Sequence, residues 1–546
     1  MPKTPPKRRT SRTSGILCHV TSLPGRSGIG DLGEAAFQFA DWLAESKQGL
    51  WQVLPLGPPG YGESPYQSYS AFAGNPLLVG LDRLADEGWL SRDELESAPP
   101  SNELVANELV ANELVANELA VDFEHIGPLR EHLLAQAYET FCGTASSQQL
   151  SEFETFRREQ SWWLDDYTFF AALKKAHAGE AWTQWSAAFV TRTSPVLKVP
   201  HIALAKAVDL EAFIQFQFHR QWQALKAYCN SRGIRLMGDV PIFVAHDSAD
   251  VWAHQELFLL GEGGLPTAVA GVPPDYFSET GQLWGNPLYR WDSMRQDGFA
   301  WWMSRIRYAL QRFDLIRLDH FRGFEAFWEV PAGAATAAGG RWVAGPGESF
   351  FRKIHEQLGD VPLVAEDLGV ITPAVAALRD DFGFPGMRIL QFAFGDDPQA
   401  PSFQPHNYPR NCVVYTGTHD NDTTVGWFRS QAGQGSTRTA AQVAAERETA
   451  LRYLGTDGSQ IHWDMIRLAL ASVADTAIVP LQDVLGLGTE SRMNLPGTAQ
   501  KNWRWRCPAG VLPGYSERLA DLTAIYERTP QAPATEASGA PTNVAE

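Results

Sequence analysis

The sequence predicts an α/β protein built as a (β/α)8 TIM barrel with largely helical insertions and an aromatic lid loop. Short runs rich in Val, Ile and Leu recur along the chain, and continuous apolar runs are typical of parallel strands buried on both faces. Helical patterns separate most of these runs, and strand alternating with helix eight times indicates a (β/α)8 barrel. The predicted strands are 16–20, 50–56, 234–242, 313–321, 362–369, 386–394, 412–420 and 476–486.

Two connections are too long for a simple barrel. Residues 57–233 carry helical patterns such as LREHLLAQAYETFC, and residues 243–300 are rich in Gly, Pro and aromatic residues. Long irregular segments of the second kind are usually lids or binding loops. We therefore predict a catalytic barrel over 15–528 that carries both insertions, between a basic tail over 1–14 and a tail over 529–546, both disordered by composition.

The first insertion contains a repeat, NELVANELVANELVANELA, over residues 102–120. A period of five residues advances by about 140° around a helix, so the apolar residues spiral instead of forming one face. A partner-binding heptad needs a different period. The repeat is therefore predicted to be a lengthened surface helix or a flexible segment.

Composition limits the classes of function. The chain has 546 residues, of which 44% are hydrophobic, and its formal net charge of −18 argues against nucleic-acid or anionic-membrane partners. Five scattered cysteines without a CxxC pair are typical of reduced thiols in a cytosolic protein. The sequence contains neither an apolar run of about 20 residues nor the apolar core of a signal peptide. We therefore expect a cytoplasmic protein.

Four of the predicted strands end in charged residues, which are not expected in a strand buried on both faces. In a barrel these positions fall on the carboxyl-terminal rim, where active sites of this fold lie. One such site could be a structural salt bridge, but like charges from four strands destabilise one another and are hard to explain as structure alone. The residues are Asp239, Arg317 with Asp319, Glu366 with Asp367, and His419 with Asp420.

A carboxylate cluster has two main chemical uses, binding a hard metal ion and glycoside chemistry. Arg317 precedes Asp319 by two residues, so both side chains are expected on one face of the strand, where the guanidinium would keep Asp319 ionised and oppose a metal cation. The long loops are rich in aromatic residues, which suit the faces of sugars. GxSxG, Walker and HExxH motifs are absent from the sequence, so we expect glycoside chemistry without a metal or cofactor.

Several motifs in order resemble the amylomaltases, the 4-α-glucanotransferases or disproportionating enzymes of glycoside hydrolase family 77. The resemblance covers about residues 15–528. An arginine-x-aspartate strand alone is weak, because it occurs throughout the α-amylase clan, whereas the ordered set is highly specific. The motifs are YGESPYQ, GVPPDYFSETGQLWGNPLY, RLDHFRG, VAEDLG, GTHDND and NLPGT followed by NWRWR.

The resemblance implies a role for each residue that matches these motifs. Asp319 would be the nucleophile, Glu366 the acid/base and Asp420 the transition-state stabiliser of a retaining double displacement. The substrates would be maltooligosaccharides and starch or glycogen-derived glucans, with glucose as an acceptor. Further substrate-binding residues, some of them under a mobile loop over 271–287, would be Arg317, His419, Asp239, Tyr61, Trp284, Asn286 and Asp275.

Three alternatives remain open from the residues. The nearest is an α-amylase-like hydrolase, in which the same site uses water as the acceptor. The second is a carbohydrate-binding protein without catalysis, against which the complete set of rim carboxylates argues. The third is a metal-dependent barrel enzyme.

Overall fold

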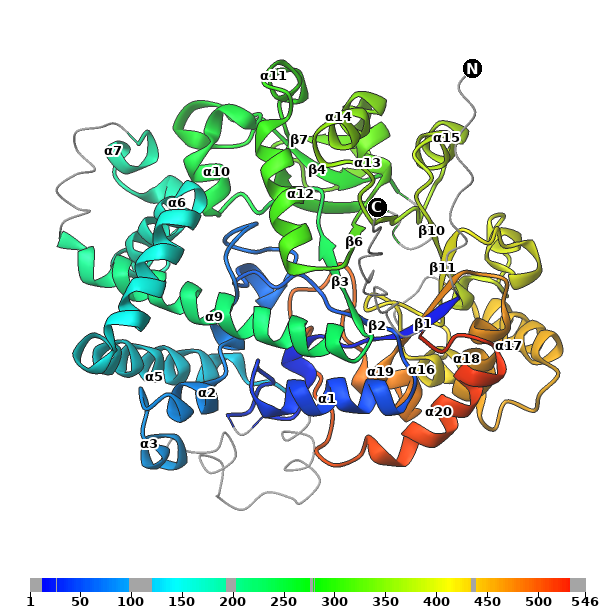
Figure 1. Cartoon of the computed structure of the whole chain (residues 1–546). Helices are drawn as coiled ribbons and strands as arrows, with labels where there is room; N and C mark the ends of the chain where they lie inside the picture. Colours follow the sequence, from blue (N-terminus) through cyan, green and yellow to red (C-terminus); the bar gives the residue numbers. More distant parts are fainter. Residues whose placement is uncertain are drawn as a thin grey trace, which may run out of the picture.

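The computed structural model describes residues 12–25, 27–97, 120–192, 203–274, 278, 280–433 and 438–530. Within these ranges eight parallel strands close into a barrel in the order β1-β12-β11-β10-β9-β6-β3-β2, which confirms the predicted (β/α)8 barrel (Figure 1). Each strand overlaps one of the predicted runs. The strands are β1 (Thr13–Leu17), β2 (Leu50–Gln52), β3 (Arg235–Val240), β6 (Leu315–Leu318), β9 (Leu363–Ala365), β10 (Gly386–Ile389), β11 (Cys412–Tyr415) and β12 (Thr476–Pro480).

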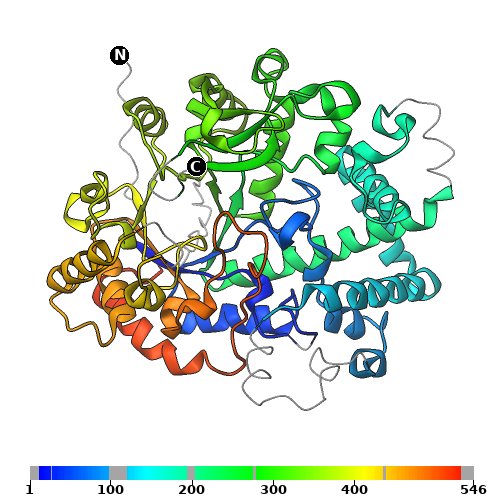
Figure 2. The ribbon, with the colours of Figure 1, turned by 180° about the vertical axis from the view of Figure 1, so that it is seen from behind.

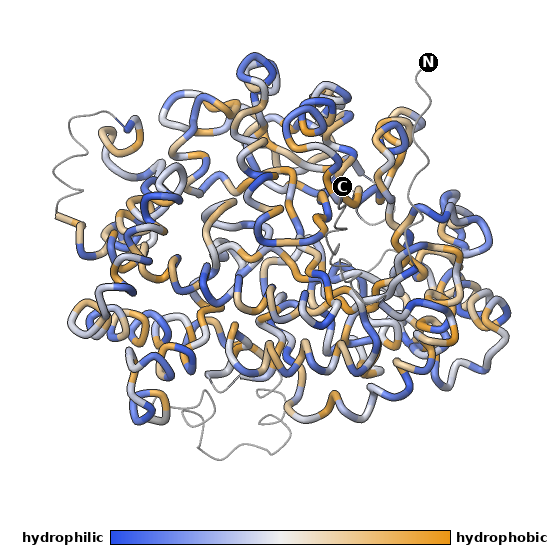
Figure 3. Tube along the Cα trace, in the orientation of Figure 1, coloured by the Kyte–Doolittle hydropathy of each residue, from blue (hydrophilic) through white to orange (hydrophobic). Residues whose placement is uncertain are grey.

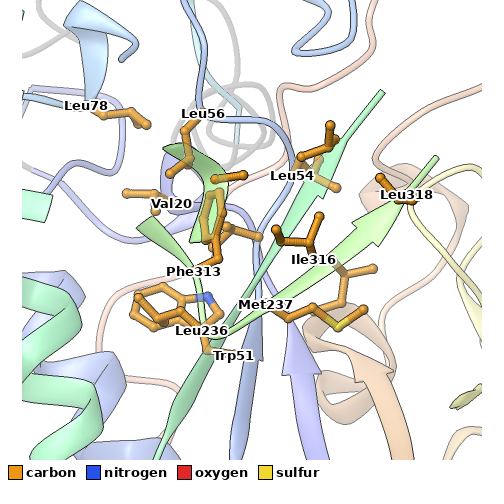
Figure 4. Close-up of a cluster of buried hydrophobic side chains, with 14 of the residues drawn as sticks. Val20, Trp51, Leu54, Leu56, Leu78, Leu236, Met237, Phe313, Ile316 and Leu318 are labelled. Atoms are coloured by element: carbon orange, nitrogen blue, oxygen red, sulfur yellow. The ribbon is translucent and has the colours of Figure 1, made fainter. Parts of the chain in front are cut away.

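Large apolar side chains hold the barrel together, as the close-up in Figure 4 shows for β2, β3 and β6. Trp51, Leu236 and Ile316 are fully buried. Each buried side chain of this size stabilises the fold by about 1.5–3 kcal/mol relative to an exposed one. Gly238 in β3 allows close packing, because a Cβ there would lie 2.2 Å from the Phe313 ring.

Helices surround the barrel, and along them hydrophilic and hydrophobic segments alternate, as expected for helices with one buried face (Figure 3). Among the helices that lie between barrel strands or after the last one are α1 (Glu34–Glu45), α9 (Ala205–Ser231), α12 (Ala300–Arg312), α14 (Glu348–Leu358), α15 (Pro373–Asp381), α16 (Thr424–Arg429), α17 (Ala440–Leu454), α18 (Ile461–Ala471), α19 (Leu481–Leu485) and α20 (Pro513–Ile525).

The connection from β2 to β3 is largely helical and forms one side of the molecule (Figures 1 and 2). Its longest helix begins with a capping box, in which Ser146 and Gln149 satisfy each other's backbone amides. Besides α9, the helices in the described part of this connection are α2 (Leu81–Asp86), α3 (Arg92–Ser97), α5 (Phe123–Thr144), α6 (Ser147–Ala176) and α7 (Ala187–Val190). Most of the NELVA repeat lies outside the described residues, and the predicted domain boundaries stay predictions.

A four-stranded antiparallel sheet, which the sequence analysis did not foresee, extends from the barrel rim. Its order is β5-β4-β7-β8. Two strands lie within the segment expected to be a loop, so residues 282–287 of the predicted lid are strand. The elements of this region are α10 (Ala249–Ala253), β4 (Ala268–Val272), β5 (Gln282–Pro287), α11 (Trp291–Gln296), α13 (Arg322–Glu325), β7 (Ala326–Pro331) and β8 (Arg341–Ala344).

The alternation of strand and helix is broken once. Between β10 and β11, all of which the structure describes, the chain forms only short 3-10 turns. Four prolines, at 398, 401, 405 and 409, remove backbone donors and prevent an α-helix there. In the described part of the chain, no helix is both long and apolar enough to cross a membrane.

Candidate active site

The predicted charged residues lie at or just after the carboxyl ends of four barrel strands. Because β3, β6 and β9 are neighbours and run parallel, their ends meet at one rim, as the ends of all barrel strands do. The apolar part of each strand is buried in the barrel wall, and the polar part begins where the strand reaches the rim. Asp239 is in β3, Arg317 in β6 with Asp319 directly after it, Glu366 directly follows β9, and His419 and Asp420 follow β11.

Arg317 links two of the carboxylates. Its Nη1 lies 2.5 Å from Oδ2 of Asp239 and its Nη2 lies 2.7 Å from Oδ1 of Asp319. Arg317 and the Asp239 side chain are buried, whereas 26% of the Asp319 side chain is exposed. Burial opposes the charge on Arg317, but the two carboxylates raise its pKa well above the ordinary value. Asp319 is therefore paired with a permanent cation while one side of its carboxylate stays open.

Tyr66 connects the end of β3 to the residues after β11. Its hydroxyl donates a 2.8 Å hydrogen bond to Oδ2 of Asp239. Its ring stacks on the His419 imidazole, with centroids 5.1 Å apart and planes 18° apart. Burial raises the pKa of Tyr66 well above its ordinary value, so the hydroxyl remains a donor at neutral pH. Tyr66 belongs to the YGESPYQ motif, but no role of its own was predicted for it.

Glu366 lies in an environment that keeps its carboxyl group protonated. Burial raises its pKa to about 8, and the negative charge of Asp319 adds to this effect. The Arg317 charge and two backbone donors act in the opposite direction: Oε1 accepts from the Leu368 amide at 2.9 Å and Oε2 from the His320 amide at 2.6 Å. The Glu366 carboxyl is thus oriented by the backbone and holds its proton at neutral pH.

His320, directly after Asp319, has an unusual backbone conformation. Its φ is 49°, in the left-handed region that non-glycine residues rarely adopt. This conformation directs its backbone amide toward Glu366. Its imidazole packs edge-on against the Trp284 ring, with ring centroids 4.8 Å apart. Burial lowers the pKa of His320 to about 4, so the ring is neutral at neutral pH. Sequence reasoning missed this residue, although it is part of the RLDHFRG motif.

Asp420 is the most exposed of the rim carboxylates, with 48% of its side chain accessible. Its Oδ1 accepts a 2.6 Å hydrogen bond from Nδ2 of Asn494 and lies 3.5 Å from Nε2 of His419. Arg492 donates a 2.6 Å hydrogen bond to the Asp420 carbonyl. Arg492 and Asn494, the first residue of the NLPGT motif, therefore hold Asp420, a role that was not predicted from the sequence.

The other predicted substrate-binding residues differ in setting. Tyr61 lies in the turn Tyr61–Glu63 and is 79% exposed, so its ring is free for a ligand. Trp284 is half-buried against His320. Asn286 is buried, donates to the Val244 carbonyl at 2.9 Å and accepts from Gln67 at 3.3 Å, so it supports the wall of the site. Asp275 lies outside the described residues.

Asp367 is not part of the rim cluster, contrary to the expectation that both acids after β9 would converge there. Its carboxylate pairs with Arg379 and Arg388 and accepts from the Met387 amide at 2.6 Å. Adjacent residues in an extended segment point in opposite directions. Glu366 therefore faces the rim, and Asp367 faces the barrel wall.

The arrangement combines a partly exposed, arginine-paired carboxylate with a buried, protonated carboxyl group. This is the pair that glycoside chemistry requires, one group to attack and one to donate a proton. Arg317 pairs with both Asp239 and Asp319, and its positive charge opposes the binding of a metal cation by these two carboxylates. Within the described residues, no group of three or more His, Cys, Asp or Glu side chains is arranged to hold a metal ion.

Comparisons with known proteins agree with this arrangement. The family model described as 4-alpha-glucanotransferase matches residues 18–511. The chain is 49% identical to a 4-alpha-glucanotransferase of Synechocystis over 95% of its length and 98% of the relative, and 48% identical to one of Thermus thermophilus over 95% and 99%.

Solved structures support the same assignment. Amylomaltase from Streptococcus agalactiae in complex with acarbose has a TM-score of 0.87 at 36% identity, over 95% of this chain and all of that one. Amylomaltase from Corynebacterium glutamicum, at 18% identity and a TM-score of 0.75 over 95% and 75% of the two chains, supports the fold alone. The family resemblance and the predicted enzyme class are confirmed, and the chain belongs to the 4-alpha-glucanotransferase family.

Proposed function

We propose that the chain transfers α-1,4-glucan segments from a maltooligosaccharide or starch-like donor to the 4-hydroxyl of a glucose or glucan acceptor. The observation that carries this proposal is the pairing of Asp319 with Arg317 beside a Glu366 carboxyl whose pKa is raised to about 8. The catalytic roles are nucleophile for Asp319, acid/base for Glu366 and transition-state stabiliser for Asp420. The polymeric substrates, starch or glycogen-derived glucans, belong to the same proposal.

In the first step the glucan lies across the rim with its scissile bond between Asp319 and Glu366. The Asp319 carboxylate attacks the anomeric carbon while Glu366 gives its proton to the leaving glycosidic oxygen. The C–O bond to the leaving chain breaks, and a covalent β-glycosyl ester forms on Asp319. The buried setting of Glu366 supports this role, because the group must be protonated when substrate binds.

Positive charge develops at the anomeric centre as the bond breaks. Asp420, whose orientation Asn494 and His419 restrain, stabilises this oxocarbenium-like state and holds ring hydroxyls. The Asp239–Arg317 pair and the Tyr66–His419 stack form the donor-sugar side of the site. The substrate-binding roles of Arg317, His419 and Asp239 rest on this arrangement.

In the second step an acceptor sugar replaces the released chain. Glu366, now a carboxylate, takes the proton of the acceptor 4-hydroxyl, whose oxygen attacks the anomeric carbon and expels Asp319. A new α-1,4 bond forms with retained configuration. Water would give hydrolysis instead, so the acceptor must be positioned well enough to compete. Trp284, Tyr61 and the segment around Asp275 are the proposed groups for this positioning.

The experiment is incubation of the purified protein with maltotriose alone, followed by product chromatography and assays for glucose and reducing ends. Glucose with a ladder of longer maltooligosaccharides and a constant number of reducing ends is the expected result. Rising reducing ends would identify a hydrolase. Loss of activity on EDTA treatment would contradict the metal-free mechanism.

The proposal of a cytoplasmic location rests on the cysteines. All five are unpaired, and four of them are buried. Unpaired thiols are common in a reducing compartment, which supports a cytoplasmic location. Thiol titration in denaturant of protein purified without reductant tests this proposal: five free thiols are expected, and fewer would contradict it.

A further inference from the structure

Two tryptophans form a pair on the antiparallel sheet that extends from the barrel rim. Trp328 in β7 and Trp342 in β8 are cross-strand neighbours, with ring centroids 5.1 Å apart and planes at 69°. The Trp328 indole N–H donates to the Ala337 carbonyl at 2.8 Å, which holds that ring in place. Trp342 is 39% exposed, so part of its ring surface is open to solvent.

The guanidinium of Arg322 lies against the Trp342 ring, with its central carbon 3.8 Å from the ring centroid. Arg322 is 7% exposed, its Nη1 donates to the Val370 carbonyl, and its Nε has no hydrogen-bond partner among the described residues. A cation–π contact of this kind fixes the plane of the indole. Trp342 is thus a flat, preorganised ring with accessible surface.

This stack lies next to the two segments that carry the catalytic carboxylates. Arg322 follows Asp319 by three residues, and Val370, which is 55% exposed, follows Glu366 by four. The two segments are joined by the 3.0 Å hydrogen bond from the Phe321 amide to the Glu366 carbonyl. The Arg322–Trp342 stack therefore lies on the side of the site where Glu366 is, and not on the side of Tyr66 and His419.

In the proposed reaction the acid/base protonates the oxygen of the leaving sugar, so its side of the site faces the leaving and acceptor chains. The C–H faces of glucose rings pack on aromatic rings, and neighbouring arginine donors suit sugar hydroxyls. We propose that Trp342, held by Arg322, is a stacking platform for an acceptor-side glucan, at a sugar residue beyond the one that reacts. The proposal rests on the proposed glucan transfer and goes beyond it by naming a residue that selects acceptor length.

The test compares Trp342→Ala with wild type in transfer from one donor to either glucose or labelled maltopentaose. We expect kcat/KM for maltopentaose to fall by roughly tenfold, mainly through KM, and kcat/KM for glucose to be unchanged. Trp342→Phe, which keeps a ring, should recover part of the loss. Trp162→Ala is the matched control, because Trp162 is 45% exposed on α6 and packs on Phe72 and Tyr308 instead of the rim.

A structural role for Trp342 would reduce transfer to both acceptors together, and an unchanged maltopentaose reaction would also overturn the proposal. A second measurement is independent of turnover: calorimetric binding of maltoheptaose and maltotriose to Asp319→Asn, with and without Trp342→Ala. The expected result is weaker binding of maltoheptaose only. Equal affinities in the two variants would overturn the platform, even if the maltotriose assay had already excluded glucan transfer.

Discussion

The backbone amide of His320 donates a 2.6 Å hydrogen bond to Oε2 of Glu366, so the residue next to the proposed nucleophile holds the proposed acid/base. The Asp319 amide bonds to the Val240 carbonyl and the Phe321 amide to the Glu366 carbonyl, each at 3.0 Å. Three consecutive amides thus tie one short segment to its two neighbouring strands. The relative position of the two carboxyl groups therefore depends on backbone geometry, which the left-handed turn at His320 makes possible.

Replacing Asp319 by Asn removes the proposed nucleophile while keeping the shape of the side chain. We expect kcat to fall by roughly 10⁴-fold or more, because an amide does not form the glycosyl ester. Steady-state transfer from maltotriose measures the loss. Asp367→Asn is the control: it breaks the pair with Arg379 and should lower the melting temperature without abolishing turnover of the folded enzyme. Wild-type rates in Asp319→Asn would remove its role.

The pH dependence of kcat/KM should report Glu366. Because its pKa is raised to about 8, the proton needed for leaving-group departure is present below that pH and is lost above it. Activity should fall about tenfold per pH unit on the alkaline side. Glu366→Gln should lack this alkaline limb. It should retain most of the first-step rate with a maltosyl fluoride donor, because the fluoride leaving group departs without needing a proton from residue 366. If the alkaline limb persisted in Glu366→Gln, the loss of activity at high pH would have to come from another titrating group.

The same pKa shift predicts a pH-dependent stability difference. The folded protein holds the Glu366 proton more tightly than the unfolded chain. The contribution of this group to the free energy of unfolding is therefore fully present below pH 4.5 and is lost as pH rises through about 8. The loss is at most about 5 kcal/mol for one such group. Thermal melts of Glu366→Gln against wild type should show a relative gain for the variant that grows over this range. A constant difference from pH 4.5 to 8.5 would contradict the shift.

Asn494 should act on catalysis through Asp420, whose Oδ1 it contacts at 2.6 Å. A hydrogen bond to a charged group contributes about 1.5–3 kcal/mol, so Asn494→Ala should lower kcat roughly 10- to 100-fold with the fold intact. Because the two residues form one unit, the double variant with Asp420→Ala should be little worse than Asp420→Ala alone. Fully additive losses would show that Asn494 works independently.

Tyr66→Phe tests the hydroxyl that reaches Asp239 separately from the ring that stacks on His419. Asp239 is buried, and its Oδ1 has no hydrogen-bond partner among the described residues. Without the Tyr66 hydroxyl, Arg317 is the one remaining partner of Oδ2 among these residues. We expect kcat to fall roughly tenfold or more, with KM nearly constant. Tyr66→Ala should lose more, because the stack disappears as well. Equal activities of Tyr66→Phe and wild type would make the hydroxyl dispensable.

The barrel was predictable because parallel strands buried on both faces leave continuous apolar runs in the sequence. The sheet β5-β4-β7-β8 was missed for the complementary reason. Its strands are partly exposed and mixed in character, as in QLWGNP of β5 and RWVA of β8, and they pair across distant parts of the chain. The helix absent between β10 and β11 could have been predicted from the four prolines of that connection.

The charged rim was also predictable in part. Asp239, Arg317, Asp319 and Glu366 lie at or directly after strand ends and Asp420 lies in the segment after β11, and the barrel geometry alone brings such ends together. Asp367 shows the limit of this reasoning, because a sequence does not say which of two adjacent acids faces the site. Its partners Arg379 and Arg388 come from the elements that follow and become visible only in the fold.

The sequence by itself determined the fold class, the family and the residues with the right chemistry, because each of these depends on local patterns and ordered motifs. Only the tertiary structure decided how those residues act on one another. Tyr66 reaches Asp239 across 173 positions of the chain, and Asn494 reaches Asp420 across 74. Burial and electrostatic contact, which set the protonation of Glu366, are properties of distances in space, and distances between remote residues exist only once the chain has folded.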